Sequence, residues 1–208
     1  MLKIEGYILI PDFETNTWLL WDEESREAIL VDPAAPSPDL LKRIEELKLK
    51  VKYIINTHGH MDHIGGNSWF KNHLSAPLMI HSADAPMLAN SAMNLSLYVG
   101  NPVSSAPPDV LLEDGMELSL GKYPVKVIHT PGHTPGGICL LADKFLISGD
   151  TLFEQSIGRT DLQGGNHQQI INSIKNKLFV LPDDVIVFPG HGPRTSIGME
   201  KKNNPFVS

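Results

Sequence analysis

A dense group of metal-ligand side chains occurs in the segment Thr57–His63, which reads Thr-His-Gly-His-Met-Asp-His. His58 and His60 are two residues apart, so an extended backbone directs both imidazoles to one side. Asp62 and His63 follow in the next turn, aimed at a neighbouring point. Two adjacent divalent metals require imidazoles for each ion, and carboxylates to offset charge and to bridge. The segment therefore favours a site for two metals.

Three more residues of ligand type, His133, Asp150 and His191, lie in later segments of the chain. Each follows an apolar run and stands in a glycine-containing turn, as the histidine segment also does. Glycine permits left-handed backbone at such turns and leaves room for a metal or substrate to approach. Four strands that deliver ligands to one end of a fold would build the site on rigid elements.

The chain alternates segments of strand and helix character, which predicts two sheets flanked by helices. One helix is expected to begin at Ser37-Pro38, a second to span Asn67–Leu74, and a third to be capped by Asn166. Strands are expected at Tyr7–Ile10, Thr17–Trp21, Ala28–Val31, Val51–Thr57, Leu78–His81, Val125–His129, Gly137–Leu141, Lys144–Ser148 and Val185–Phe188.

Composition sets broad limits on what the protein does. A net charge of −7 argues against a nucleic-acid partner, because such surfaces normally show a basic face. The N-terminus has no uninterrupted apolar run typical of a signal peptide, and no stretch approaches the roughly 20 apolar residues that cross a bilayer. The single cysteine, Cys139, excludes an internal disulfide and is expected to be buried. We therefore expect a cytoplasmic protein without a membrane partner.

The ordered ligands, His-x-His-x-Asp-His followed by His, Asp and His, resemble the metallo-β-lactamase superfamily over nearly the whole chain. Within it, Ser156–Asp161 and Asn204-Pro205-Phe206 resemble the short glyoxalase-II-like (hydroxyacylglutathione hydrolase-like) hydrolases. The resemblance implies an α/β fold, an αββα sandwich of two mixed sheets flanked by helices, with the metal site at the sheet edges. We expect residues 1–208 to form one such domain. The extra C-terminal helical glutathione-binding domain of full-length glyoxalase II enzymes is not expected, because only Thr195–Ser208 remain near the C-terminus.

The same resemblance implies a set of ligands and two catalytic carboxylates, Asp62 and Asp150. The first metal would be held by His58, His60 and His133. The second would be held by Asp62, His63 and His191, with Asp150 bridging the two. Zinc is the expected metal, while imidazole and carboxylate donors also suit iron and manganese.

The implied reaction is hydrolysis of a thioester, such as S-lactoylglutathione or a related acyl-thiol, by a metal-bound hydroxide. The missing helical domain weakens the glutathione assignment and leaves other thiol carriers open. Arg159 is predicted to bind a substrate carboxylate through two parallel hydrogen bonds. An ion pair with Asp161 that holds the loop is the alternative role for Arg159.

Two other functions remain open at this stage. One is a mononuclear iron persulfide dioxygenase, in which His58, His133 and Asp150 would form a two-histidine, one-carboxylate site. The other is a non-catalytic metal-binding module. The segment 90–108, rich in Asn, Ser, Pro and Gly, is either a wall of the binding site or a packed connection.

Overall fold

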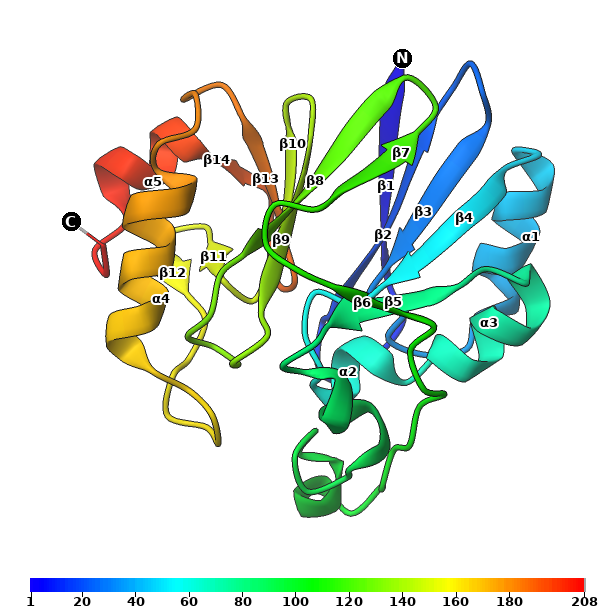
Figure 1. The fold of residues 1–208 in the computed structure, drawn as a ribbon, viewed down its shortest axis with the longest axis horizontal. Coiled ribbons are helices and arrows are strands. Elements are labelled where there is room, and N and C mark those ends of the chain that lie inside the picture. The colour runs from blue at the N-terminus through cyan, green and yellow to red at the C-terminus, as the bar shows by residue number, and fades with distance from the viewer. Residues whose placement is uncertain (208) are drawn as a thin grey trace.

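In the computed structural model, which describes residues 1–207, two six-stranded sheets pack face to face and helices cover both outer faces (Figure 1). In the first sheet the strands lie in the order β1 (Leu2–Ile8), β2 (Asn16–Asp22), β3 (Glu27–Val31), β4 (Lys50–Ile55), β5 (Leu78–His81) and β6 (Val110–Leu112). In the second they lie in the order β14 (Thr195–Ser196), β13 (Ile186–Pro189), β10 (Phe145–Gly149), β9 (Ile138–Ala142), β8 (Tyr123–His129) and β7 (Glu117–Leu120).

Both sheets are mixed, which confirms the predicted sandwich. Strands β3 to β6 are parallel to one another and β1–β3 are antiparallel. In the second sheet only β10 and β13 form a parallel pair. A small two-stranded ribbon of β11 (Leu152–Phe153) and β12 (Ser156–Ile157) follows β10.

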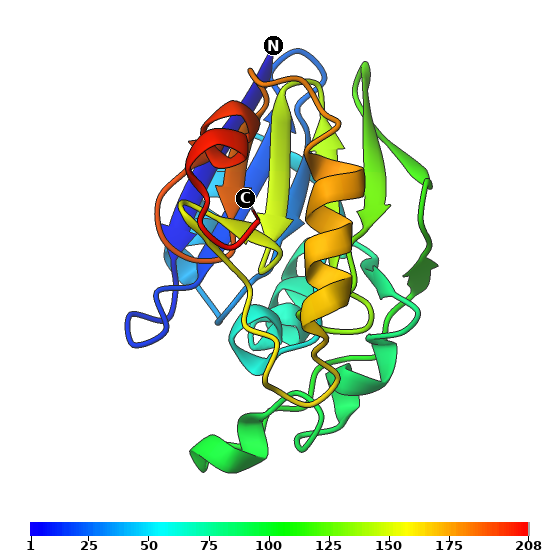
Figure 2. The same ribbon diagram turned by 90° about the vertical axis from the view of Figure 1, so that its left-hand side faces the viewer.

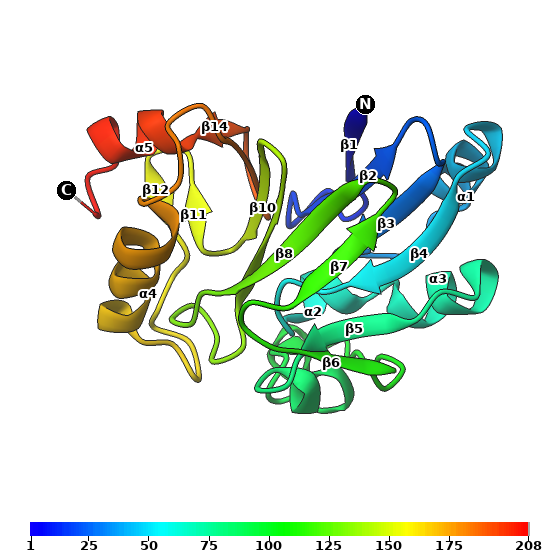
Figure 3. The same cartoon turned by 45° about the horizontal axis from the view of Figure 1, so that its top comes forward.

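The helices divide between the two outer faces, as Figure 3 shows from above. The first sheet carries α1 (Pro38–Glu46), α2 (Met61–Ile64) and α3 (Asn67–Leu74), and the second carries α4 (His167–Ser173), its π-helical continuation η3 (Ile174–Leu178) and α5 (Ile197–Asn203). Ser37 and Asn166 accept hydrogen bonds from backbone N–H groups of the first turn, so both predicted N-caps are confirmed. Among residues 1–207, no helix is both long enough and apolar enough to span a membrane.

Three apolar layers hold the sandwich together. Between the sheets, side chains such as Leu20 and Ile55 pack with Val127 and Phe188. Outside the first sheet, α1 and α3 bury Leu40 and Phe70 against it, and outside the second, η3 buries Leu178. Each fully buried side chain of this size contributes about 1.5–3 kcal/mol. This packing holds the ends of the strands rigid, and the ligand turns follow these strand ends.

The first strand differs from the prediction, because β1 spans Leu2–Ile8 and not Tyr7–Ile10. It pairs with β2 from Leu2 opposite Asp22 to Ile8 opposite Asn16, at the edge of the sheet. Its alternating apolar and charged residues suit an edge strand that is only half covered. The short strands β6, β7 and β14 and helix α5 were also not predicted, since each spans only two to seven residues.

The segment 90–108 is in part the packed connection that the sequence left open as one of two roles. Asn94 and Ser96 are buried, and the Asn94 side chain donates to the carbonyls of Met87 and Val103. The single turn η2 (Ser96–Val99) exposes Leu97, Tyr98 and Val99 at a tip that projects from the sandwich (Figure 2). Its base is therefore a packed connection, while its tip is open to solvent.

Candidate metal centre

Turns at one end of the sandwich bring together all seven residues of ligand type. The histidine segment follows β4 and enters α2, and the later residues follow β8, β10 and β13. Within each of three sets, the donor atoms lie within 4.8 Å of one another: His58, His60 and His133 (the first trio); Asp62, His63 and His191 (the second trio); and His58, His63 and Asp150. The third set shares one histidine with each trio and so connects them.

The spacing of the donor atoms suits metal coordination. His60 Nδ1 lies 3.0 Å from His133 Nε2, and His63 Nε2 lies 3.4 Å from His191 Nε2. Asp150 reaches both trios, with Oδ1 3.5 Å from His63 Nε2 and Oδ2 3.5 Å from His133 Nε2. Metal–ligand distances of about 2.0–2.2 Å place the donors of a tetrahedral ion roughly 3.3–3.6 Å apart.

Unpaired polar atoms also mark the cluster as a metal site. Among the described residues, the buried side-chain atoms without a hydrogen-bond partner are His58 Nε2, His60 Nε2 and Asp150 Oδ1. A buried donor or acceptor left unpaired costs about 1–3 kcal/mol, so such atoms are rare without a functional reason. All three belong to the seven, which supports cation binding at this point.

Proton affinities differ sharply across the cluster. Burial first, and neighbouring histidines second, hold the pKa of His58 well below its usual range and lower that of His60 to about 3. Burial also opposes protonation of His63 and His191, but the two carboxylates of the cluster outweigh it and raise their pKa to about 9 and about 11. The pair of buried carboxylates thus creates a negative potential that attracts cations.

In three of the imidazole rings, Nδ1 forms a hydrogen bond to an oxygen atom, and this bond sets the orientation of the ring. Because a carbonyl or carboxylate oxygen only accepts, each Nδ1 is the donor and each Nε2 is the nitrogen that would bind a metal. The pairs are His63 Nδ1 with Asp32 Oδ2 at 3.0 Å, His133 Nδ1 with the Arg159 carbonyl at 2.8 Å, and His191 Nδ1 with the Phe13 carbonyl at 2.9 Å.

Asp32 supports the centre without being one of the predicted residues. Its carboxylate accepts from the Thr57 backbone N–H at 2.7 Å and from the Thr57 hydroxyl at 2.6 Å, besides the ring of His63. It directly follows β3, as the ligand turns follow their strands, so its position in Val31-Asp32-Pro33 was a usable signal. Thr15, whose hydroxyl donates to Asp62 Oδ2 at 2.9 Å, had no such signal.

Asp84 connects the two loops that carry the first trio. Its fully buried carboxylate accepts from the Gly59 N–H at 3.1 Å, the Thr134 hydroxyl at 2.7 Å and the Gly136 N–H at 2.6 Å. Burial raises the pKa of Asp84, while these hydrogen bonds oppose that effect. No spacing in the sequence pointed to this residue, because it becomes meaningful only when the two loops meet.

Asp84→Asn is expected to lower the free energy of unfolding of the metal-free protein by about 2 kcal/mol, because its amide NH₂ would face a backbone N–H donor and leave it unpaired. Loosening of the loops should also weaken metal binding by roughly 10–100-fold. Thermal unfolding and metal titration check both effects. Asp143→Asn, in an exposed turn with φ 52°, is the matched control. Equal metal affinity in the two variants would contradict the connecting role.

Gly190 shows how closely the backbone approaches the centre. A side chain there would overlap Asp150 Oδ1 and the ring of His63. The turn after β13 therefore needs glycine for space, and not for conformation.

Arg159 contributes to the centre through its backbone. Its carbonyl orients His133, while its guanidinium forms two hydrogen bonds to the Asp161 carboxylate at 2.8 and 2.7 Å. The side chain is 62% exposed, and its pair with Asp161 is the loop ion pair given above as the alternative role.

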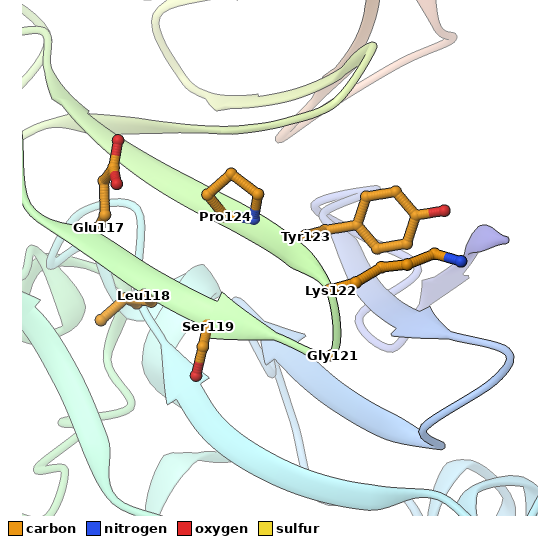
Figure 4. A pocket seen from close by; sticks show the side chains of 7 residues that line it. All are labelled: Glu117, Leu118, Ser119, Gly121, Lys122, Tyr123 and Pro124. Atoms are coloured by element: carbon orange, nitrogen blue, oxygen red, sulfur yellow. The ribbon is translucent and has the colours of Figure 1, made fainter.

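The hollows of the surface lie at different distances from this centre. The hollow over the β7–β8 hairpin, lined by Glu117 and Lys122 among others (Figure 4), adjoins Gly121. Gly121 packs on Asp22 at one end of β2, whereas Asn16 at the other end of β2 bonds to Gly190 beside the centre. That hollow therefore lies at the opposite end of β2 from the metal ligands. A second hollow, lined partly by Met87 and Pro135, adjoins the first trio.

Comparison with known proteins agrees with this geometry. The family model described as the metallo-beta-lactamase superfamily matches residues 10–191. A relative from Haemophilus influenzae named hydroxyacylglutathione hydrolase GloC is 37% identical over 97% of this chain and 96% of its own. A crystal structure described as the BLEG-1 B3 metallo-beta-lactamase superposes with a TM-score of 0.93 at 38% identity, covering 99% of this chain and 100% of that one. A di-iron-bound form of TTHA1623 gives a TM-score of 0.86 at 32% identity, with 97% and 99% covered.

Proposed function

The chain belongs to the metallo-β-lactamase superfamily, a metallo-hydrolase superfamily, and from this premise we propose that it hydrolyses thioesters in the manner of glyoxalase II. The observation that carries the proposal is the convergence of two complete donor trios, joined by Asp150, at one end of the sandwich. The name of the Haemophilus influenzae relative supports an acyl-thiol as the small-molecule substrate. The buried thiol of Cys139 suits the reducing cytoplasm that we propose as its location.

We propose that two divalent ions, zinc in the first place, occupy the trios. When bound, they would acidify a water molecule and polarise the substrate carbonyl. The carboxylates of Asp150 and Asp62 would offset the charge of the ions, and the Thr15 hydroxyl orients Asp62. His191, 28% exposed, and Asp62, 14% exposed, leave the centre accessible to substrate.

The second trio supplies the donors that a dinuclear hydrolase needs and that a mononuclear iron dioxygenase does not use. A dioxygenase centre needs two histidines and one carboxylate on one metal. Here Asp62, His63 and His191 form a further set of donors as tight as the first trio. Two of its rings also have oriented Nδ1 atoms, so that each Nε2 faces Asp62 as a further donor would.

Turnover by metal-loaded protein tests the proposal. The panel contains S-lactoylglutathione, N-acetylcysteamine thioesters, a lactone, a phosphodiester and a chromogenic cephalosporin, with chelated protein as the control. We expect thioester hydrolysis that disappears on chelation and returns with metal. Hydrolysis of the cephalosporin alone would make the protein a β-lactamase, and turnover of none would leave a metal-binding module.

If Arg159 anchors the substrate, single variants of Arg159 and of Asp161 should differ in their effect on KM. Arg159→Lys should raise KM about tenfold, because a lysine cannot form the paired hydrogen bonds to a carboxylate. Asp161→Asn should leave KM unchanged or lower it, since it frees the guanidinium from its present partner. An exposed ion pair contributes only about 0–1 kcal/mol, so neither should change the melting temperature much. A similar loss of stability in both variants, at constant KM, would assign the pair to loop structure.

A further inference from the structure

A small hollow of about 120 Å³ lies between Pro135, in the loop of His133, and Met87. Its lining residues are Ala83, Met87, Met93, Pro135, Gln163 and Gly164. Met87 packs directly on Gly59, the residue between two ligand histidines, so that a side chain at Gly59 would collide with it. Pro135 stands two residues after His133. The hollow therefore touches the His133 loop through Pro135 and reaches the histidine segment through Met87.

Resting on the proposed thioester hydrolysis, we propose that this hollow receives the acyl chain of the substrate and selects short, uncharged aliphatic acyl groups. A thioester has two arms, and only one of them ends within a few atoms of the reacting carbonyl. The thiol arm of a carrier continues into a large polar body, which a hollow of this size has no room to hold. The acyl arm ends within a few atoms, so it is the arm that the hollow can hold.

The volume of the hollow limits the length of the acyl chain that it can hold. Pockets that enclose a whole drug-sized ligand measure about 300–1,000 Å³, so this one takes only part of a molecule. A dry apolar cavity of about 150 Å³ admits benzene, with six carbons. A hollow of about 120 Å³ therefore holds an acyl group of about four carbons.

The side chains that line the hollow determine which acyl chains it can accept, in polarity and in charge. Two methionines, an alanine and a proline present apolar surface, and Gln163 provides the single polar side chain. No lining residue carries a charge, so an acyl chain that ends in a carboxylate would lose its hydration without a partner. Methionine side chains adapt to the shape of an aliphatic guest.

The hollow is held in shape by the residue that anchors the segment 90–108. Asn94, next to Met93, donates to the Met87 carbonyl at 3.0 Å, and its own carbonyl accepts from the Met61 N–H at 3.0 Å. Both methionines are thus tied to each other and to the turn that carries the second trio's Asp62. A preformed pocket of this kind selects by size.

A series of N-acetylcysteamine thioesters tests the selection, because only the acyl chain changes. From acetyl to butanoyl, kcat/KM should rise about three- to fourfold per methylene, and it should fall at hexanoyl and for succinyl. Met93→Ala should move the optimum to hexanoyl, and Ala83→Leu should lower butanoyl turnover at least tenfold while sparing acetyl. Both positions tolerate change, since Ala83 is exposed and Met93 half-buried. Met199→Ala, at an exposed methionine on α5, is the matched control.

Methionine methyl resonances of the metal-loaded protein give a second readout that needs no turnover. Butanoate should shift the Met87 and Met93 signals and acetate should not, with Met199 unmoved by both. A flat acyl series in an enzyme that does hydrolyse thioesters overturns the acyl site and leaves the proposed function intact. If no thioester is hydrolysed, the proposed function fails, and butanoate shifts at the two methionines still decide whether the hollow binds short aliphatic acids.

Discussion

Asp150→Asn is expected to reduce kcat by more than about 100-fold in a protein that remains folded. Loss of a group that only supports a metal ligand already costs roughly 10–100-fold, and Asp150 is one of the donors. Its two oxygens lie 3.4–3.5 Å from the Nε2 atoms of His63, His133 and His191. Asparagine keeps the shape but removes the charge that both trios share, and it turns an NH₂ group toward one of them.

Steady-state kinetics with saturating metal, beside circular dichroism and thermal unfolding, measure this effect. Asp143→Asn makes the same chemical change in an exposed turn and should retain full activity. Saturating metal matters because weaker binding alone would be rescued by excess metal, whereas loss of the shared charge would not. An Asn variant as fast as the wild type would refute the role of Asp150 between the trios.

The positions of the predicted ligands follow from local signals in the sequence. Glycine turns after apolar runs located His133, Asp150 and His191, because a strand fixes where its last residue points. The strands of the sandwich interior were also marked by continuous apolar runs, as in β3 and β10. Elements at the sheet edges carried weaker marks, which is why β1 was placed several residues late.

What the sequence did not reveal are contacts between loops distant along the chain. Asp84 joins Gly59 to Gly136, and the Phe13 carbonyl meets His191 across 178 positions. Neither residue has a periodicity or a motif that announces its partner. The hollow beside the first trio is a similar case, since Met87, Met93 and Pro135 come from three separate segments. Such features arise from tertiary packing, and only the folded structure places them.

Wild-type protein is expected to bind two divalent ions per chain, and one ligand change should remove one of them. His60→Ala should empty the first trio, since His60 belongs to that donor set alone, and His191→Ala should empty the second. His58→Ala is a less clean probe, because His58 also belongs to the set that includes His63 and Asp150. Loss of one imidazole from a three-residue set removes a third of its protein donors, so affinity at that site should fall by at least about 100-fold.

Metal analysis by mass spectrometry after dialysis against buffered metal, together with calorimetric titration of chelated protein, measures the two sites. His167→Ala, at an exposed position on α4, should bind two ions as the wild type does. A wild-type stoichiometry that stays at one under saturating metal would remove the dinuclear mechanism. In that case oxygen uptake with glutathione persulfide becomes the decisive assay, because His58, His133 and Asp150 could then serve a single iron. The second trio argues for two ions, because its two rings, held by Asp32 and the Phe13 carbonyl, direct their Nε2 atoms at carboxylates and so complete a second donor set.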